Sequence, residues 1–255
     1  NRSHRLCICI LCSAIGVTVR AKNYDVSPTG SDAADGQPIE TAWATVDNGE
    51  SLGKIDPGDT VFILPGYYAP TSAIVITVSG TSDMPVVYQA LGPQRPTFYG
   101  ANQPGSLFDI DASYIVLKGV EIRNVPLRGI DLDGDYCTIT GCYIRNVGNH
   151  GILVTGDHNE ILYNIVSYPA ESGIRNEGFG NYTHIYNNTV YHTGRYGIEI
   201  TSTVNSVRIF NNIVAYSGTD GITAPAGNVC GFNNVWGSAE ENYGSSAVDS
   251  AGGIV

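Results

Sequence analysis

This sequence of 255 residues has few charged side chains, a single methionine and no hydrophobic run of membrane-spanning length. Charged residues make up 15% of the chain and hydrophobic residues 42%, with 31 glycines and 16 tyrosines. This balance predicts a folded, loop-rich protein with little helix. The apolar run from Leu6 to Val19 is too short for a comfortable membrane span, and no later run is longer. The sequence therefore predicts no membrane span.

The first 21 residues have the order of a secretory signal peptide. Arg2 and Arg5 give a basic start, the apolar run follows, and small side chains lie near Ala21. A buried N-terminal strand is the alternative, but the charged flanks favour the signal peptide. We therefore expect an exported protein, which is secreted to the extracellular space, the periplasm or the cell surface. Because the sequence does not begin with methionine, we also expect it to be a fragment.

Cysteine is scarce after the predicted signal peptide, and no CxxC pair remains there. Cys137, Cys142 and Cys230 form an odd set, which argues against a zinc site or a full disulfide framework. The sequence predicts buried thiols at these positions.

Basic residues are also scarce, and this limits the partners that the protein can bind. Removing residues 1–21 takes away three arginines and no acidic residue, so the formal charge changes from -11 to -14. Such a surface repels nucleic acid and anionic lipid. It would also repel an anionic polysaccharide, unless a bound cation or a local arginine inverts the field.

A repeat of 22 to 24 residues runs through the second half of the chain. The pair Gly-Ile recurs at positions 129, 151, 173, 197 and 221, so the spacings are 22, 22, 24 and 24. A second set keeps the same phase, with GVEI at 119, GCYI at 141, YNIV at 163, NNTV at 187, NNIV at 211 and NNVW at 233. Apolar and polar residues alternate over short runs, and no unit has room for a helix. This period predicts stacked coils of short strands, which is a parallel β-helix.

Several residue types occupy fixed places in the repeat. Leu117, Ile139, Ile161, Ile185 and Ile209 share one column. A ladder of stacked side-chain amides is predicted at one turn, formed by Asn164, Asn188, Asn212 and Asn234. The glycine before each repeated isoleucine is expected to let the backbone bend into the next strand. These asparagines and glycines are interpreted as structural.

The repeat, the asparagine ladder and the stretch from YDVSPTG to GDTVFILPGYY resemble the right-handed parallel β-helix proteins of the pectate-lyase-like superfamily. The resemblance runs from about Tyr24 to the end of the chain. It implies an all-β solenoid in which residues 22–107 form an N-terminal cap and the first irregular coils. Residues 108–255 would form regular coils. Because members of the superfamily usually continue further, we expect the coil stack to be truncated at its C-terminus.

The resemblance also implies a short N-terminal helix that caps the first coil. It would lie around Thr41 to Ile55, with Trp43, Val46 and Leu52 on its apolar face. Gly49 weakens this prediction, because glycine disfavours a helix interior.

The residues after each repeated isoleucine form the candidate site. Strand alternation points them outward, in a column that reads Asp131, Leu153, Arg175, Glu199 and Thr223. Two residues further on, the column reads Asp133, Thr155, Glu177, Thr201 and Pro225. In the superfamily the substrate groove lies along such a face, and the resemblance implies a groove here.

Chemical roles follow for the ionisable members of these columns. Asp131, Asp133 and Glu177 offer hard oxygen ligands for Ca²⁺. Arg175 and Glu199 are the catalytic candidates, and by family analogy Arg175 would neutralise a substrate carboxylate or act as base. The competing interpretation is that Arg175 and Glu199 form only a cross-strand ion pair.

Residues in the preceding turns are candidates for substrate binding. They are Tyr168, His192, Arg195 and Tyr196. Aromatic rings cover the apolar face of a sugar, and arginine pairs with carboxylates. For any single tyrosine, ordinary packing is the alternative. His150, which precedes Gly151 beside the expected groove, is a further candidate.

Several motifs of known members are missing. The chain lacks the Gly-His-Gly and Arg-Ile-Lys of polygalacturonases and the Trp-x-Asp-His of the pectate lyases proper, and none of its three lysines falls in a Gly-Ile strand. The best interpretation is an exported monomer that binds and cleaves an acidic polysaccharide by β-elimination, with Ca²⁺ as cofactor. Three alternatives stay open: an adhesin-like glycan-binding scaffold without activity, a glycoside hydrolase that uses Asp131 and Asp133, and an epimerase.

Overall fold

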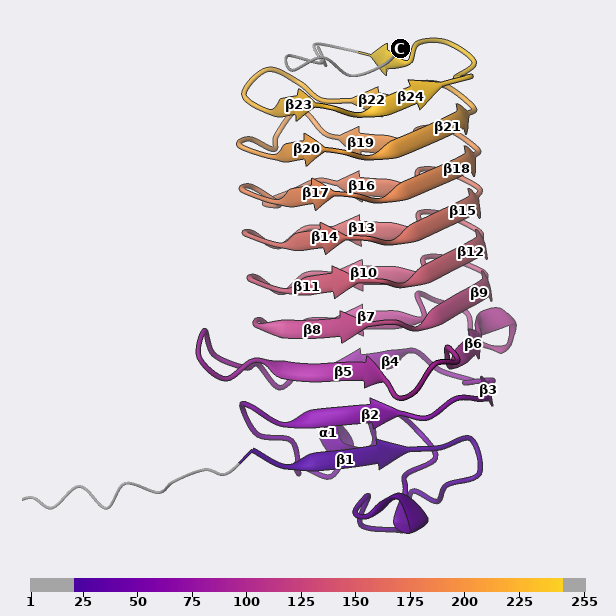
Figure 1. Cartoon of the computed structure of the whole chain (residues 1–255), viewed down its shortest axis with the longest axis vertical. Coiled ribbons are helices and arrows are strands. Elements are labelled where there is room, and N and C mark those ends of the chain that lie inside the picture. The colour runs from indigo at the N-terminus through magenta and orange to yellow at the C-terminus, as the bar shows by residue number, and fades with distance from the viewer. Residues whose placement is uncertain (1–20, 245–255) are drawn as a thin grey trace, which may run out of the picture.

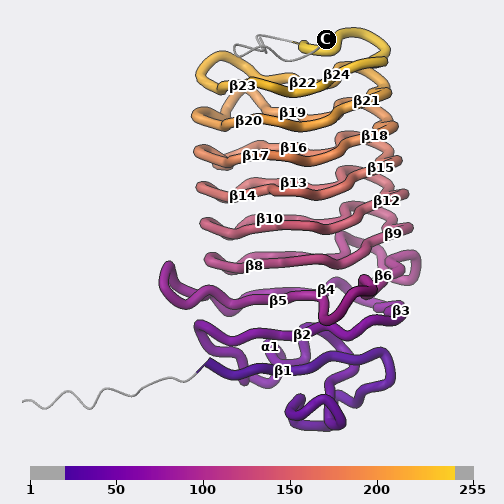
Figure 2. The backbone as a smooth tube through the Cα atoms, viewed as in Figure 1, coloured from indigo at the N-terminus to yellow at the C-terminus, as the bar shows by residue number. Residues whose placement is uncertain are grey.

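The computed structural model describes residues 21–244, which form a stack of coils built from three parallel sheets (Figure 1). After the first coil, which adds a strand only to the first sheet, each coil passes through the sheets in the same order, here called A, B and C, and then rises to the next coil (Figure 2). The predicted signal peptide and the predicted C-terminal truncation lie outside these residues, apart from Ala21. The prediction of an all-β parallel solenoid is confirmed.

The strands of each sheet follow one another along the stack. Sheet A holds β1 (Asn23–Val26), β2 (Thr60–Ile63), β5 (Val86–Ala90), β8 (Ile115–Lys118), β11 (Thr138–Thr140), β14 (Glu160–Leu162), β17 (His184–Tyr186), β20 (Arg208–Phe210) and β23 (Val229–Gly231). Sheet B holds β3 (Tyr67–Tyr68), β6 (Thr97–Tyr99), β9 (Glu121–Val125), β12 (Tyr143–Val147), β15 (Ile165–Pro169), β18 (Thr189–Thr193), β21 (Ile213–Ser217) and β24 (Asn234–Trp236). Sheet C holds β4 (Ile74–Ile76), β7 (Phe108–Ile110), β10 (Ile130–Leu132), β13 (Ile152–Val154), β16 (Ile174–Asn176), β19 (Ile198–Ile200), β22 (Ile222–Thr223) and β25 (Tyr243–Gly244).

The inward columns make one continuous hydrophobic core. In sheet A the predicted column from Leu117 to Ile209 is fully buried at every coil. In sheet C, Ile130 pairs with Ile152 above it, and both are fully buried. Each coil therefore covers the apolar surface of the next, and no single coil could bury its own.

Turns of different length join sheet C to sheet A. Residues 155–159 connect β13 to β14, whereas the longer segment 177–183 connects β16 to β17. The strand register is unchanged across this difference, because Ile174 pairs with Ile198 as Ile152 pairs with Ile174. The change of repeat length from 22 to 24 residues is therefore absorbed in the turn.

The asparagine ladder lies in the turn between sheets A and B and is buried. The side-chain oxygen of Asn188 accepts hydrogen bonds from the backbone N–H of Asn164 at 2.9 Å and from its side-chain amide at 3.1 Å. Asn212 repeats this pattern one coil later. The fourth member is Asn233 rather than the predicted Asn234, which is exposed on β24. The last spacing is 21 residues instead of 22, so the phase shifts by one residue.

The repeated glycines have a packing role that differs from the predicted one. A Cβ atom built on Gly129 would lie 2.6 Å from Ile144 Cγ2 and 2.7 Å from the carbonyl oxygen of Gly151. Gly129 is not among the glycines with positive φ. Close approach of neighbouring coils, and not backbone bending, therefore requires glycine here.

The N-terminal cap contains less helix than predicted. The 3₁₀-helix η1 (Ile39–Thr41) and the single-turn helix α1 (Asn48–Ser51) replace the helix expected over 41–55, and η2 (Gly100–Asn102) is a second 3₁₀ turn. Trp43 is fully buried in extended backbone that bridges to Val26, while Leu52 is 51% exposed. Tertiary packing of Trp43 outweighs helix propensity in this segment. No helix in residues 21–244 has the length and hydrophobicity to cross a membrane.

The three cysteines after the predicted signal peptide are buried, as predicted. Burial raises the pKa of the Cys137 and Cys142 thiols to about 11. Both are therefore protonated, unreactive packing residues at neutral pH.

Candidate functional site

The outward face of sheet C carries the predicted columns in the predicted register. Asp131 pairs with Leu153, Leu153 with Arg175 and Arg175 with Glu199, one coil apart at each step. Leu153 is buried, so the ionisable groups form two clusters that it separates. One lies at Asp131 and the coil before it, and the other around Arg175.

Arg175 is ion-paired with two carboxylates. Its Nε donates to Glu177 Oε2 at 2.6 Å, and its Nη1 donates to Glu199 Oε1 at 2.8 Å. Ser172 Oγ donates to the second oxygen of Glu199 at 2.5 Å. The cross-strand ion pair of Arg175 with Glu199 therefore exists, and together with the Glu177 pair it occupies two of the five N–H donors of the guanidinium.

The pairing decides the protonation state of Arg175. Burial alone would lower the pKa of Arg175, but Glu177 and Glu199 outweigh burial and raise that pKa above its usual value. Arg175 is therefore a fixed cation, which suits charge neutralisation and is unsuited to proton abstraction.

The three predicted metal ligands do not come together. Asp131 accepts from Arg128 Nη1 at 2.6 Å and from Ser106 Oγ at 3.2 Å. Glu177 is paired with Arg175, two coils from Asp133. Only Asp133 remains in a carboxylate cluster, where it also accepts a short hydrogen bond from Thr155 Oγ1.

The carboxylate cluster that the structure assembles is Asp109, Asp111 and Asp133. One ligand oxygen from each residue lies within 4.8 Å of the others. Asp109 pairs with Asp131 in the register of β7 and β10, so two Asp-x-Asp segments stack on adjacent coils. The sequence signal was the Asp-x-Asp at 109 and 111, exactly one 22-residue repeat before 131 and 133.

The carboxylates of this cluster repel one another. Burial raises the pKa of Asp109, and the neighbouring carboxylates raise it further, against a smaller opposite effect of Arg128. A divalent cation would relieve this repulsion, and three carboxylates leave Ca²⁺ several of its six to eight positions for water or a substrate carboxylate.

Tyr168 and His192 lie on sheet B, not on sheet C. Both have positive φ and project from β15 and β18 into a stack of rings. Tyr168 lies 5.2 Å from His192 with an interplanar angle of 7°, and His192 lies 5.0 Å from Tyr216 at 16°. The stacking covers both faces of His192 and one face of Tyr168, so a sugar would meet mainly ring edges.

Arg195 and Tyr196 lie in the turn that joins β18 to β19. Arg195 Nη1 is 3.2 Å from Glu171 Oε2, and its guanidinium lies 5.0 Å from the Tyr196 ring centroid. Arg195 is exposed and Tyr196 is half-buried, and they lie four and three residues before Glu199, in the part of the turn that leads into β19. They are the part of the predicted substrate-binding set that adjoins the candidate face.

His150 is a structural residue of the same edge. Its side chain is 8% exposed, and its Nδ1 accepts a hydrogen bond from the Ser172 backbone N–H at 3.2 Å. Burial, followed by the charges of Arg175 and Arg128, lowers the pKa of His150 to about 4. The ring is neutral at pH 7 with its proton on Nε2, so it has no free basic nitrogen for proton abstraction.

A family model described as the right-handed β-helix region of Pel9A-like proteins matches residues 24–181, more than half of the chain. The chain belongs to the Pel9A-like right-handed β-helix family. The matched range includes the carboxylate cluster, Arg175 and Glu177. His192, Arg195, Tyr196 and Glu199 lie beyond it.

One relative and two solved structures are similar to the chain. Pectate lyase PEL9 of Emericella nidulans is 36% identical over 104 residues, which are 40% of this chain and 24% of PEL9. The chain thus matches about a quarter of the length of that relative. The crystal structure of pectate lyase Pel9A superposes with a TM-score of 0.67 at 16% identity, covering 91% of this chain and 73% of Pel9A. An alginate lyase from Paenibacillus sp. str. FPU-7 gives 0.68 at 15% identity, covering 83% and 75%. At these identities the two structures show the shared fold.

Proposed function

We propose that the protein is an exported, monomeric polysaccharide lyase that binds a polyuronate along the outer face of sheet C. The observation that carries this proposal is the cluster of Asp109, Asp111 and Asp133 on that face. Family membership and the pectate lyase relative support the reaction class. The protein itself is strongly acidic, so a polyanion needs a local positive charge in order to bind.

Four residues are proposed to bind the substrate and neutralise its charge, which are two of the requirements of β-elimination. Asp109, Asp111 and Asp133 would hold Ca²⁺, and the bound ion would neutralise a substrate carboxylate and so acidify the proton alpha to it. Arg175 lies two coils from Asp133, about 10 Å at 4.8 Å per coil. Its Nη2 donors are not used in the two ion pairs, so Arg175 can bind a second uronate of the same polymer. Glu199 and Glu177 fix its orientation.

The test is the ultraviolet absorbance of the unsaturated uronate that only β-elimination makes. Pectate, alginate and chondroitin are mixed with the protein in Ca²⁺ or in chelator. We expect a Ca²⁺-dependent rise on at least one polymer. Asp111→Asn should lower the rate by about tenfold or more through the cation, and Arg175→Ala should raise KM by about tenfold through the lost contact with the second uronate.

Matched variants keep this test specific. Glu160→Gln and Arg208→Ala alter exposed residues of sheet A and should leave the rate unchanged. A thermal unfolding curve for each variant separates lost activity from lost folding. Equal rates in Ca²⁺ and in chelator would refute the role of the cluster.

A non-catalytic glycan-binding scaffold is the second candidate. It is favoured by the observation that Arg175 and Arg128 are both ion-paired, so the face resembles a set of satisfied cross-strand pairs. In that case the polymer is retarded in an affinity gel without any absorbance rise. A hydrolase would instead release reducing ends without the absorbance change, and an epimerase would change the polymer without cutting it.

A further inference from the structure

The outer face of sheet B carries a pair of arginines on adjacent coils. Arg123 of β9 and Arg145 of β12 are direct partners in the strand register. Both approach one oxygen atom, Glu121 Oε1, which lies 3.2 Å from Arg145 Nη2 and 4.0 Å from Arg123 Nη1. Because the two guanidiniums converge on a single atom, one small anion beside them can contact both.

Glu121 satisfies this pair only in part. Arg145 Nε donates to Glu121 Oε1 at 3.2 Å, whereas Arg123 Nη1 is too far from the same oxygen for a hydrogen bond. Arg123 Nε is buried and has no hydrogen-bond partner among the described residues. The second oxygen of Glu121 accepts from Thr97 Oγ1 at 3.2 Å. One carboxylate therefore serves two cations, and the pair keeps an excess positive charge.

The neighbouring turn from sheet A to sheet B adds to this charge. Arg95 and Lys118 line one hollow of the surface there. Arg95 Nη1 donates a short hydrogen bond to the carbonyl oxygen of Gly141, and no ion pair within residues 21–244 involves Arg95 or Lys118. Lys118 lies three residues before Glu121. In a chain with a formal charge of -11, this basic region is a place where an anion is attracted.

Tyrosine rings border the arginine pair. The Arg123 guanidinium lies 5.7 Å from the centroid of the Tyr67 ring, and the Arg145 guanidinium lies 5.7 Å from that of Tyr143. Tyr67 and Tyr143 lie three strands apart in one column, about 14 Å at 4.8 Å per strand. A single sugar ring cannot reach from one tyrosine to the other. The arrangement instead suits a short stretch of a polymer that runs along the stack.

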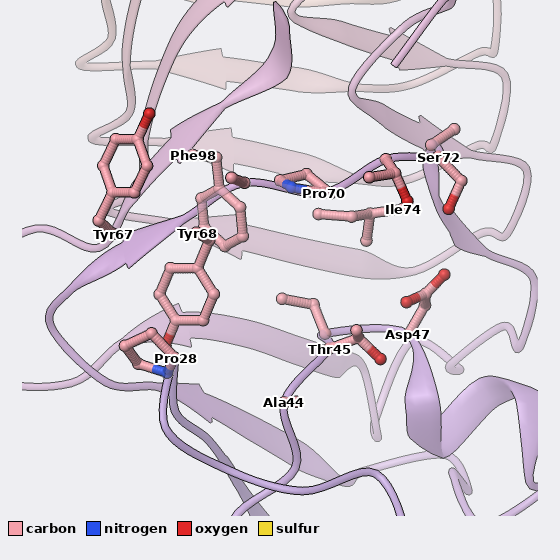
Figure 3. Close-up of a pocket in the computed structure, with 14 residues that line it drawn as sticks. Pro28, Ala44, Thr45, Asp47, Tyr67, Tyr68, Pro70, Ser72, Ile74 and Phe98 are labelled. Atoms are coloured by element: carbon pink, nitrogen blue, oxygen red, sulfur yellow. The ribbon is translucent and has the colours of Figure 1, made fainter. Parts of the chain in front are cut away.

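Tyr67 is turned outward at the start of this face. Its neighbour on β3, Tyr68, is buried, and both line the cavity drawn in Figure 3. In that view the Tyr68 ring points toward Pro28, whereas the Tyr67 ring points away from it. Tyr67 is 51% exposed and lies 5.9 Å from the Tyr99 ring. An exposed ring of this kind can contact the apolar face of a sugar.

We propose that Arg123 and Arg145 form a second binding site for a polyuronate, on sheet B and separate from the candidate site on sheet C. A uronate carboxylate binds beside the two guanidiniums and balances the charge that Glu121 leaves over. Sugars on either side of this uronate meet Tyr67 and Tyr143. The site needs no Ca²⁺, because its positive charge comes from side chains. The choice of a polyuronate rests on the proposed function, but binding at sheet B does not require cleavage.

Affinity electrophoresis in gels that contain pectate tests this site in the full chain. All proteins carry Arg175→Ala and the buffer contains a chelator, so neither Arg175 nor Ca²⁺ holds the polymer on sheet C. We expect retardation in pectate and none in galactan, a neutral polymer. Arg123→Gln should weaken the binding about tenfold, because a hydrogen-bonded contact between charged groups is lost.

Glu121→Gln provides a change in the opposite direction. The amide keeps the shape of the side chain, and its oxygen can still accept from Thr97. It no longer competes with the polymer for the two arginines, so the affinity for pectate should rise about threefold. If Glu121 and the arginines only stabilised the fold, the variant would bind pectate no more tightly than the parent.

The control is Arg208→Gln, which removes the same charge from an exposed residue of sheet A and should leave the affinity unchanged within about twofold. A thermal unfolding curve for each variant checks that it is folded. Equal weakening by Arg123→Gln and Arg208→Gln, no retardation by pectate, or equal retardation by galactan would overturn the proposal. So would a dimer in size-exclusion chromatography that Arg123→Gln dissociates, because this face would then bind a second copy. If the lyase assay fails while retardation still depends on Arg123, cleavage is rejected and this site stands.

Discussion

At the scale of single residues, His150 links the candidate face to pH. Its folded-state pKa of about 4 lies below the ordinary value of 6.5, so the unfolded state binds a proton more readily. The stability that this creates is fully present above about pH 6.5 and is lost as the pH falls toward 4. We expect a loss of about 2 kcal/mol between pH 7 and pH 4.5, because the two pH units below 6.5 correspond to about 1.36 kcal/mol each and the folded state itself begins to bind the proton near pH 4.5.

Urea unfolding of the protein and of His150→Gln at pH 7 and pH 4.5 measures this contribution. Between the two pH values, the free energy of unfolding should fall by about 2 kcal/mol more in the unaltered protein than in the variant. Carboxylates titrate in both proteins, and their effect cancels in the difference. Identical pH dependence in the two proteins would show that His150 is not the titrating group.

The individual site residues were predictable only in part. Strand alternation correctly placed Arg175 and Glu199 in one outward column, because a period of two is a property of every strand. Which carboxylates come together could not be read in the same way. Asp131 forms an ion pair with Arg128, three residues earlier. This contact depends on the path of the turn rather than on the repeat. The Gly-Ile repeat does not indicate Asp109, because the coil of Asp109 precedes the first Gly-Ile pair.

At the scale of elements, the asparagine ladder gives a sharp mutational contrast. In Asn188→Ala the backbone N–H of Asn164 and the carbonyl of Ile161 lose their buried partners. We expect a loss of about 3 kcal/mol in the free energy of unfolding, because unsatisfied buried groups cost about 1–3 kcal/mol each. Asn234→Ala, on the exposed side of β24, should cost less than about 0.5 kcal/mol. Chemical denaturation measures the free energy of unfolding of the two variants. Similar losses in both would mean that the buried ladder is not a special source of stability.

The bulged strands of sheet B show where pattern reading fails within an element. Ile144 and Val147 are both buried although they are three residues apart, because Asn146 between them has φ 54°. In later coils tyrosine and histidine take this left-handed position, which side chains other than glycine and asparagine rarely adopt. Stacking of Tyr168 on His192 accompanies this unusual conformation, and the sequence alone gives no sign of it.

At the scale of the whole molecule, each coil contacts only its neighbours, so damage should stay local. In Asn188→Ala we expect faster amide hydrogen exchange in residues 160–215, by up to about 100-fold for a loss near 3 kcal/mol. Exchange in residues 24–110 should be unchanged. Mass spectrometry of exchanged peptides measures both regions in one experiment. An equal acceleration throughout the chain would show instead that the solenoid opens as a single cooperative unit.

In the turns from sheet C to sheet A, the length of the segment varies while the register of the strands stays the same. The connecting segment 177–183 is longer than the segment 155–159, yet the strands on either side keep their pairing. Lengthening a flexible surface loop costs little, about 0.6 kcal/mol for each doubling. Insertions at this edge can therefore reshape the wall beside the sheet C face one coil at a time, and the buried columns remain untouched. If the sheet C face binds a polymer as proposed, the lengths of these turns would change which polymer fits, and this edge is the place to engineer a new specificity.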